Sequence, residues 1–196
     1  MRKTVILTAL ALAFGIGTGS AQGTYDIDTA HSNVDFKIRH LMSKVSGHFT
    51  DFDGTIVADF DNLDTSSVEF TIQAASIDTK NEKRDGHLRS SDFFDVENHP
   101  EITFKSSKIT RVDDDTFAVA GTLTVRGVAK EITLMVDFLG EMSAMGGTRA
   151  GYELTTTVNR MDYGVSWNRT LEGGGLLLSE EVEVNIALEL IKKESE

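Results

Sequence analysis

The sequence predicts an all-β protein, an eight-stranded antiparallel barrel with a short helical insertion, and three observations carry this prediction. Eight segments alternate apolar and polar residues with period two, which is typical of strands that bury one face. Their connections are short, which favours antiparallel neighbours over crossover helices. Closing eight such strands into a barrel buries every apolar face and removes exposed edges, although a two-sheet sandwich remains an alternative.

The strands are expected, in chain order, within residues 34–40, 56–60, 68–74, 102–106, 117–125, 132–138, 152–158 and 182–190. The last is the clearest, because Val182, Val184 and Ile186 share one face with Leu188 and Leu190 while glutamates fill the other. Inner positions elsewhere mix phenylalanine with alanine, glycine and serine. At eight strands a barrel is either just filled by side chains or holds one slender ligand, so both an open and a packed interior are consistent with this pattern.

Two insertions interrupt the meander, residues 76–100 and residues 160–178, and both carry aromatic side chains. In the first, Ser90 or Ser91 is expected to cap a short helix in "SSDFFDV", which places Phe93 and Phe94 against the barrel mouth. Pro100 then biases the chain towards the strand that follows. There is no internal repeat, low-complexity run or linker, so residues 22–196 are predicted to form one domain.

Residues 1–21 have the pattern of a secretory signal peptide. Arg2 and Lys3 precede an apolar run that is too short to span a bilayer, and small residues end at Ala21. We expect cleavage after Ala21 and a periplasmic mature protein, with an uncleaved membrane anchor as the alternative.

Charge and cysteine content narrow the function further. Removal of the leader leaves 17 basic and 31 acidic residues, a net charge of −14, which disfavours nucleic acid and stable membrane insertion. The absence of cysteine means that the core stabilises the fold without disulfides. The sequence leaves the oligomeric state open, a homodimer included.

No motif predicts catalysis, a metal or a cofactor. The five histidines show neither H-x-H nor H-E-x-x-H spacing, and there is no G-x-S-x-G nucleophile motif. We therefore expect a binding protein without enzymatic activity, no cofactor and no metal site.

Residues 80–89 form a basic island in this acidic chain. Lys80, Lys83, Arg84 and Arg89 lie within ten positions, and arginine binds phosphate or carboxylate through two parallel hydrogen bonds. An anionic head group at the mouth of an apolar tunnel is one interpretation. The alternative is structural, with Arg84, Asp85 and Arg89 paired among themselves.

Five blocks, taken together, resemble the YceI-like polyisoprenoid-binding proteins: "DTAHSNVDFKIRHLMSKVSGHFTDFDGTI", "ASIDT", "RDGHLRSSDFFDVENHPEITFKSS", "GTLTVRGVAKEITL" and "NRMDYGVSW". The resemblance runs from about Tyr25 to Leu190. Gly86 and Ala129 depart from the usual pattern without touching the apolar positions. The resemblance implies a lipocalin-like antiparallel barrel whose apolar tunnel holds a long isoprenoid or similar lipid in the periplasm, and it supplies no catalytic residue.

On this basis we expect binding or carriage of a long-chain isoprenoid or similar lipid. The alternative is a hydrolase or other enzyme acting on a lipid or glycan in the same cavity. Residues predicted to contact the lipid are Phe36, Ile38, Phe70, Ile72, Phe93, Phe94, Phe104, Leu123, Leu134 and Phe138. Residues predicted to contact a polar head group are Arg84, His87 and Arg89.

Overall fold

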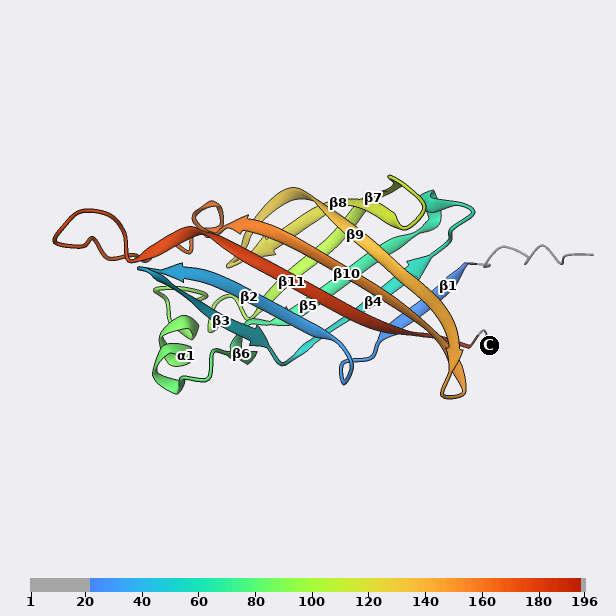
Figure 1. Cartoon of the computed structure of the whole chain (residues 1–196), viewed down its shortest axis with the longest axis horizontal. Helices are drawn as coiled ribbons and strands as arrows, with labels where there is room; N and C mark the ends of the chain where they lie inside the picture. Colours follow the sequence, from blue (N-terminus) through green and yellow to red (C-terminus); the bar gives the residue numbers. More distant parts are fainter. Residues whose placement is uncertain (1–21, 195–196) are drawn as a thin grey trace, which may run out of the picture.

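The structure, a computed structural model, describes residues 22–194 and consists almost entirely of antiparallel strands (Figure 1). The predicted leader, residues 1–21, lies outside the described residues. The strands are β1 (Gly23–Ile27), β2 (Asn33–His40), β3 (Ser43–Phe49), β4 (Phe52–Ala58), β5 (Ser67–Gln73), β6 (Ile77–Asp78), β7 (Glu101–Arg111), β8 (Thr116–Val125), β9 (Val128–Ala144), β10 (Gly147–Asn159) and β11 (Leu178–Lys192). The helical segments are α1 (Glu82–Arg89) and the 3-10 turns η1 (Leu63–Thr65), η2 (Ala74–Ser76) and η3 (Arg160–Tyr163).

Eight strands close into a barrel in the order β1-β4-β5-β7-β8-β9-β10-β11, and the β1–β11 pairing completes the circuit. All pairings are antiparallel, as the short connections predicted. The eight-stranded barrel is therefore confirmed. Closure leaves the strands of this circuit without a free edge, which removes the surface on which strands aggregate.

Three further strands, β2, β3 and β6, lie outside the closed circuit and extend the sheet at one end of the barrel. β2 pairs with residues 178–187 of β11, while β1 pairs with residues 190–192 of the same strand. β3 then pairs with β2, and β6 with β3. The pairs β1/β2, β3/β4 and β5/β6 thus act as three long strands, each interrupted once, which lengthen one end of the barrel.

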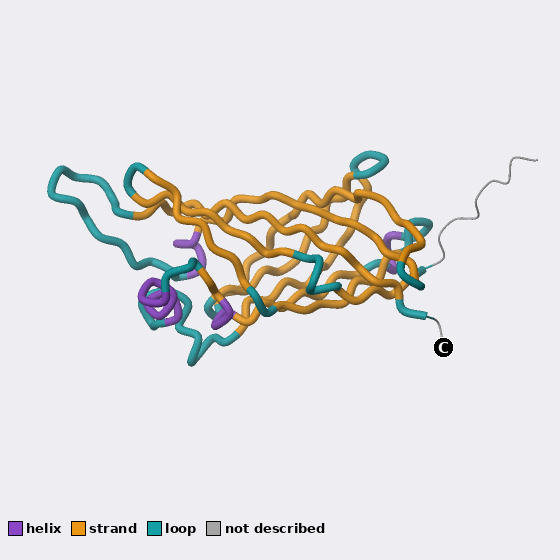
Figure 2. Tube along the Cα trace, turned by 60° about the horizontal axis from the view of Figure 1, so that its bottom comes forward, coloured by secondary structure: helices purple, strands orange, loops and turns teal. Residues whose placement is uncertain are grey.

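The two insertions gather at this lengthened end. α1 and the turns that follow it connect β6 to β7, and η3 with residues 164–177 connects β10 to β11. Figure 2 shows both at one end of the barrel, while the two ends of the described chain lie at the other. Among the residues described, no helix is long and apolar enough to cross a membrane.

The short helix lies earlier in the chain than we predicted. It begins after Asn81, whose side chain accepts a hydrogen bond from the Arg84 amide at 3.0 Å, and it ends at Arg89. Ser90 is the C-cap rather than the N-cap, because "SSDFFDV" forms turns. The helix "EKRDGHLR" has a single apolar residue, Leu88, so no apolar stripe marks it in the sequence.

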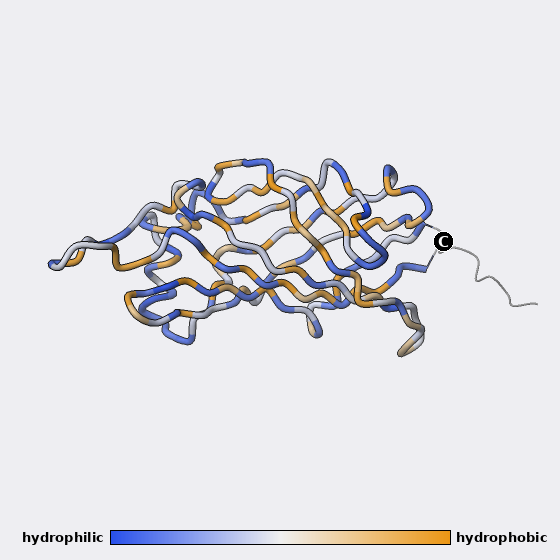
Figure 3. The backbone as a smooth tube through the Cα atoms, turned by 45° about the horizontal axis from the view of Figure 1, so that its top comes forward, coloured by the Kyte–Doolittle hydropathy of each residue, from blue (hydrophilic) through white to orange (hydrophobic). Residues whose placement is uncertain are grey.

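Hydrophobic and hydrophilic residues alternate along the strands, as the colouring in Figure 3 shows, and the buried apolar residues form one cluster in the barrel. The buried cluster includes Tyr25, Val34, Ile77 and Leu190, each no more than 2% exposed. Because the polar positions between them face solvent, the interior remains almost wholly apolar.

Candidate functional site

The barrel interior is not filled at the α1 end. A cavity of about 590 Å³ lies there, a size typical of sites for small organic ligands. Its wall comes from β2, β3, β5, β7 to β11, α1 and the two insertions. Successive side chains of a strand point to opposite faces, so every second residue of a lining strand points into the barrel, and most of these residues are apolar.

A second cavity of about 140 Å³ extends the space towards the chain termini. Its wall is almost entirely apolar, with Asp59 and Tyr152 among its few polar residues. Burial raises the pKa of Tyr152 well above its ordinary value, so this phenol stays neutral. The residues shared by both walls are Phe70, Phe104, Leu134, Leu154 and Ile186. The two cavities therefore follow one another along the barrel, separated by these five side chains.

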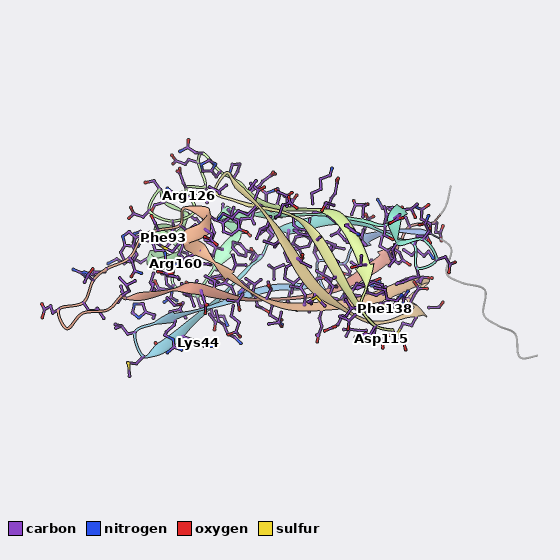
Figure 4. The ribbon with its side chains drawn as sticks, turned by 90° about the horizontal axis from the view of Figure 1, so that it is seen from above. Lys44, Phe93, Asp115, Arg126, Phe138 and Arg160 are labelled. Atoms are coloured by element: carbon purple, nitrogen blue, oxygen red, sulfur yellow. The ribbon has the colours of Figure 1, made fainter. Side chains whose placement is uncertain are left out.

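Nine of the ten residues that we predicted to line the tunnel do line the larger cavity: Phe36, Ile38, Phe70, Ile72, Phe93, Phe94, Phe104, Leu123 and Leu134. Phe138 does not belong to either wall. Its ring packs at 5.3 Å from Phe60 and 5.2 Å from Tyr152, centroid to centroid, towards the other end of the barrel (Figure 4). That these residues contact a lipid stays a prediction.

An aromatic cluster covers the cavity at the α1 end. Trp167, in the segment between η3 and β11, packs with its ring centroid 5.2 Å from Phe93 and 5.0 Å from His87. His87 also lies 2.8 Å, Nε2 to Oδ2, from Asp92. Trp167, His87 and Phe93 all line the cavity. Because they come from two separate insertions, these contacts join α1 and the turns after it to the segment before β11.

The two arginines that we predicted to meet a head group both donate hydrogen bonds within the protein, and their contact with a head group stays a prediction. Arg84 donates from Nε to Thr79 Oγ1 at 2.6 Å and from Nη2 to the Thr79 carbonyl at 2.7 Å. Arg89 donates to the carbonyls of Ala75, at 2.7 Å, and Ile77, at 2.9 Å. Arg84 and His87 line the cavity, and Arg89 is not part of its wall.

Asp85, the partner that the structural alternative gave to Arg84 and Arg89, bonds to Thr79 rather than directly to either arginine. Asp85 is 6% exposed, and its Oδ1 accepts hydrogen bonds from the Thr79 amide, at 3.0 Å, and from the Thr79 hydroxyl. Thr79 thus joins α1 to the chain after β6. The sequence shows that these side chains are charged, but it does not show that the Arg89 guanidinium lies within hydrogen-bond distance of carbonyls in η2 and β6.

Among the cavity residues that sequence reasoning missed, Arg160 at the start of η3 is the buried charged one. It is 5% exposed and lines the larger cavity. Its Nε donates to the Ser179 carbonyl at 2.9 Å, and its Nη1 to the carbonyls of Val165 and Trp167, the latter at 3.0 Å. The motif "NRMDYGVSW" contains this residue, but neither its spacing nor its composition indicates that a charge is buried there.

One group of potential metal ligands occurs among the described residues: Asp28, His31 and Glu189. Arg149 Nη1 lies between the two carboxylates, 2.7 Å from Asp28 Oδ2 and 2.6 Å from Glu189 Oε1. The guanidinium already balances these negative charges and holds the pKa of Asp28 below its ordinary value, with His31 contributing. We therefore interpret the group as an ion-pair cluster that ties β10 and β11 to the β1–β2 turn.

Comparison with known sequences gives a consistent result across nearly the whole chain. The model of the YceI-like domain family matches residues 25–190. A UPF0312 protein of Staphylococcus aureus strain N315 is 39% identical over 168 residues, which cover 84% of this chain and 95% of the relative.

Solved structures share the fold. The YCEI protein of Campylobacter jejuni is 33% identical, with a TM-score of 0.68 and coverage of 86% of this chain and 97% of that chain. BcnA of Burkholderia cenocepacia is 23% identical, with a TM-score of 0.73 and coverage of 83% and 98%. A polyisoprenoid-binding domain from Saccharophagus degradans is 17% identical, with a TM-score of 0.66 and coverage of 86% and 98%. The last two, at these identities, show similarity of fold alone.

Proposed function

Because the chain belongs to the YceI-like family, we propose that it binds a long-chain isoprenoid or a similar lipid in its barrel cavity and carries it without chemical change. The observation that carries the proposal is the apolar cavity of about 590 Å³, followed along the barrel axis by the smaller one of about 140 Å³. Such a shape suits a chain that is long and thin. The Saccharophagus degradans domain is described as polyisoprenoid-binding, and we transfer that ligand class to this chain as part of the proposal.

Burial of the chain supplies the affinity. Each methylene moved from water into an apolar site contributes about 0.8 kcal/mol, so a prenyl tail of several units has more gross driving force than reversible binding needs. Non-covalent affinities saturate near about 20 kcal/mol, and ordering of the flexible tail offsets much of the gain. The protein therefore needs few polar contacts to hold its ligand, and a cover that opens is enough to release it.

The cellular place of this activity follows, in our proposal, from the leader. Residues 1–21 carry an export pattern, so the lipid would be bound in the periplasm after cleavage at Ala21. A water-filled compartment between two membranes is a place where an apolar molecule needs such a carrier. N-terminal sequencing of the protein from a periplasmic fraction should give Gln22, and retention of Met1 would contradict this part of the proposal.

The test of binding uses delipidated mature protein and an uncharged prenol. Trp167 is the only tryptophan and lines the cavity, so its fluorescence reports occupancy directly. We expect saturable quenching or a spectral shift with one prenol per chain. A Trp167→Phe variant, read by mass spectrometry instead, is the matched control for a probe artefact. Absence of saturable binding by both readouts would overturn the proposal.

A further inference from the structure

Charge is distributed unevenly along the cavity. At the α1 end the wall includes two guanidinium groups, those of Arg84 and Arg160, and one carboxylate, that of the exposed Asp35 on β2. The smaller cavity, towards the chain termini, includes the carboxylate of Asp59 and no basic residue. An amphipathic ligand in this space therefore meets its cationic surroundings at the α1 end only.

The two arginines differ in how their charge is balanced. Arg84 shares Thr79 with the carboxylate of Asp85, since both groups hydrogen-bond to the Thr79 hydroxyl, and this carboxylate offsets the guanidinium charge. Arg160 forms no salt bridge with any described residue, and Glu180 acts on it only at longer range. Burial lowers the pKa of Arg160 from its ordinary value, which reflects the cost of keeping this charge out of water.

The hydrogen bonds of Arg160 are also incomplete. Carbonyl oxygens occupy Nε and Nη1, but Nη2 has no hydrogen-bond partner in the described part of the chain. A buried donor without an acceptor is unfavourable, and a buried cation without a counterion is more so. An anionic oxygen at this position would correct both defects, because arginine binds such oxygens with charge-assisted hydrogen bonds. The segment 164–177, which covers Arg160, includes Trp167 of the aromatic cover.

We propose that the cavity takes a lipid with an anionic oxygen head group, a phosphate or a carboxylate, that lies beside Arg160 at the α1 end while its tail extends towards Tyr152. This inference rests on the proposed lipid-binding function and adds the class of head group and the orientation of the ligand. His87 and Tyr163, which line the same end of the cavity, are the other polar neighbours of the head group. Figure 4 shows Arg160 and Phe93 at this end and Phe138 towards the other.

The experiment compares three ligands of similar tail length: a prenyl phosphate, the matching uncharged prenol and a long-chain fatty acid. Delipidated wild type should bind at least one of the anions about 10- to 100-fold more tightly than the prenol, the range that one charge-assisted hydrogen bond supplies. Which anion binds more tightly identifies phosphate or carboxylate as the head group. Arg160→Gln should reduce the ratio of anion affinity to prenol affinity to near one, and Arg160→Lys should retain part of it.

Arg126 provides the matched control. It donates from Nη1 to the Gly164 carbonyl and from Nη2 to the Ser91 carbonyl at 2.7 Å, so it also holds the segment after η3, but it does not line the cavity. Arg126→Gln should keep the wild-type affinity ratio. Equal loss of the ratio in Arg126→Gln and Arg160→Gln would mean that the two arginines only shape the segment, and this would overturn the inference.

Orientation gives a readout that needs no variant. A prenyl phosphate with a photoreactive group at the tail terminus should crosslink wild type at the wall of the smaller cavity, near Tyr152. Crosslinks at Trp167 or Phe93 would place the tail at the wrong end and contradict the inference. If wild type binds prenol and anions equally, the head-group inference fails while the proposed function stands. If it binds none of them, both fail.

Discussion

The indole of Trp167 and the imidazole of His87 meet edge to face, with ring centroids 5.0 Å apart and planes at 85°. One ring comes from the segment before β11 and the other from α1, so this contact joins the two insertions over the cavity. Aromatic contacts of this kind contribute about 0.5–1.5 kcal/mol beyond burial. We infer that it is part of the barrier to ligand release.

Replacement of His87 tests this role. His87→Ala should raise the dissociation rate of a bound prenol by roughly 2- to 10-fold, because the lost contact energy lowers the barrier to opening. Stopped-flow fluorescence of Trp167 measures this rate. The control is His48→Ala, since His48 on β3 also has a carboxylate partner, Asp78 at 3.7 Å, but does not line the cavity. An unchanged dissociation rate in His87→Ala would show that the contact between His87 and Trp167 does not limit ligand release.

The junction between the two cavities should set the longest tail that fits. Leu134 belongs to both walls, so Leu134→Trp places its extra volume in the open space and blocks the passage. We expect a free energy of unfolding within about 1 kcal/mol of wild type, with affinity lost only for the longer members of a prenol series. Urea unfolding and a binding series measure the two effects.

Ala74→Trp is the comparison for Leu134→Trp. Ala74 is 1% exposed and lies outside both cavity walls, so the added ring has no room and should cost about 2 kcal/mol or more. If Leu134→Trp were as destabilised as Ala74→Trp, the interior at the junction would be a packed core and the tunnel would not continue beyond it.

Acid should weaken the attachment of the β1–β2 turn. The guanidinium of Arg149, with His31, holds the pKa of Asp28 below its ordinary value of 3.8. The ion pair therefore stabilises the fold fully above that value, and its contribution is lost as the pH falls through the lower pKa of the folded state. Asp28→Asn should be less stable than wild type at neutral pH, and the difference should shrink below about pH 3.8.

Urea titrations at several pH values measure the effect of Asp28→Asn. Asp114→Asn, in the exposed β7–β8 turn where no described residue forms a salt bridge with it, should show a small difference at every pH. A stability gap for Asp28→Asn that stays constant from neutral pH to well below 3.8 would exclude the ion pair as its cause.

The β8–β9 turn is fitted to the insertion after β6. Gly127 has φ of +72°, and a Cβ there would lie 2.7 Å from His99 Cε1. Gly127→Ala should therefore cost more than the roughly 1–2 kcal/mol of a left-handed alanine. Gly146→Ala, in the β9–β10 turn with φ of +83° and no atom within 4 Å, should show the backbone cost alone. Equal destabilisation of the two variants, measured by urea unfolding, would show that the His99 side chain moves away from the added methyl group at no cost in free energy.

Period-two alternation was enough to predict the barrel, because each long strand buries one face. β1, β3 and β6 escaped prediction for physical reasons: β6 has two residues, β1 has five, and β3 has Gly47 at a buried position where an apolar side chain would be read. The same alternation predicted most of the cavity-lining residues that we named. Phe138 shows where this reasoning fails, because a residue on the inner face can pack against its neighbours without lining a cavity.

The polar part of the site could not be predicted in this way. Arg84 and Arg89 looked available for a ligand, but they donate to backbone carbonyls and, from Arg84, to the Thr79 hydroxyl, and no sequence pattern reveals these contacts. Arg160 is the opposite case, a charge that burial and an unfilled hydrogen-bonding position make conspicuous only in three dimensions. The charge cluster in the sequence thus lies at the end of the barrel where Arg84 and His87 line the cavity, whereas the burial of Arg160 became visible only in the structure.

The central claim, that the cavity holds a lipid, is tested most directly by native mass spectrometry of the mature protein purified without detergent. The account predicts a species heavier than the polypeptide by the mass of one lipid, which is released on activation and recovered by solvent extraction. After extraction, added prenol should restore a one-to-one complex. A polypeptide that shows its bare mass from every preparation and takes up no prenol would contradict the claim.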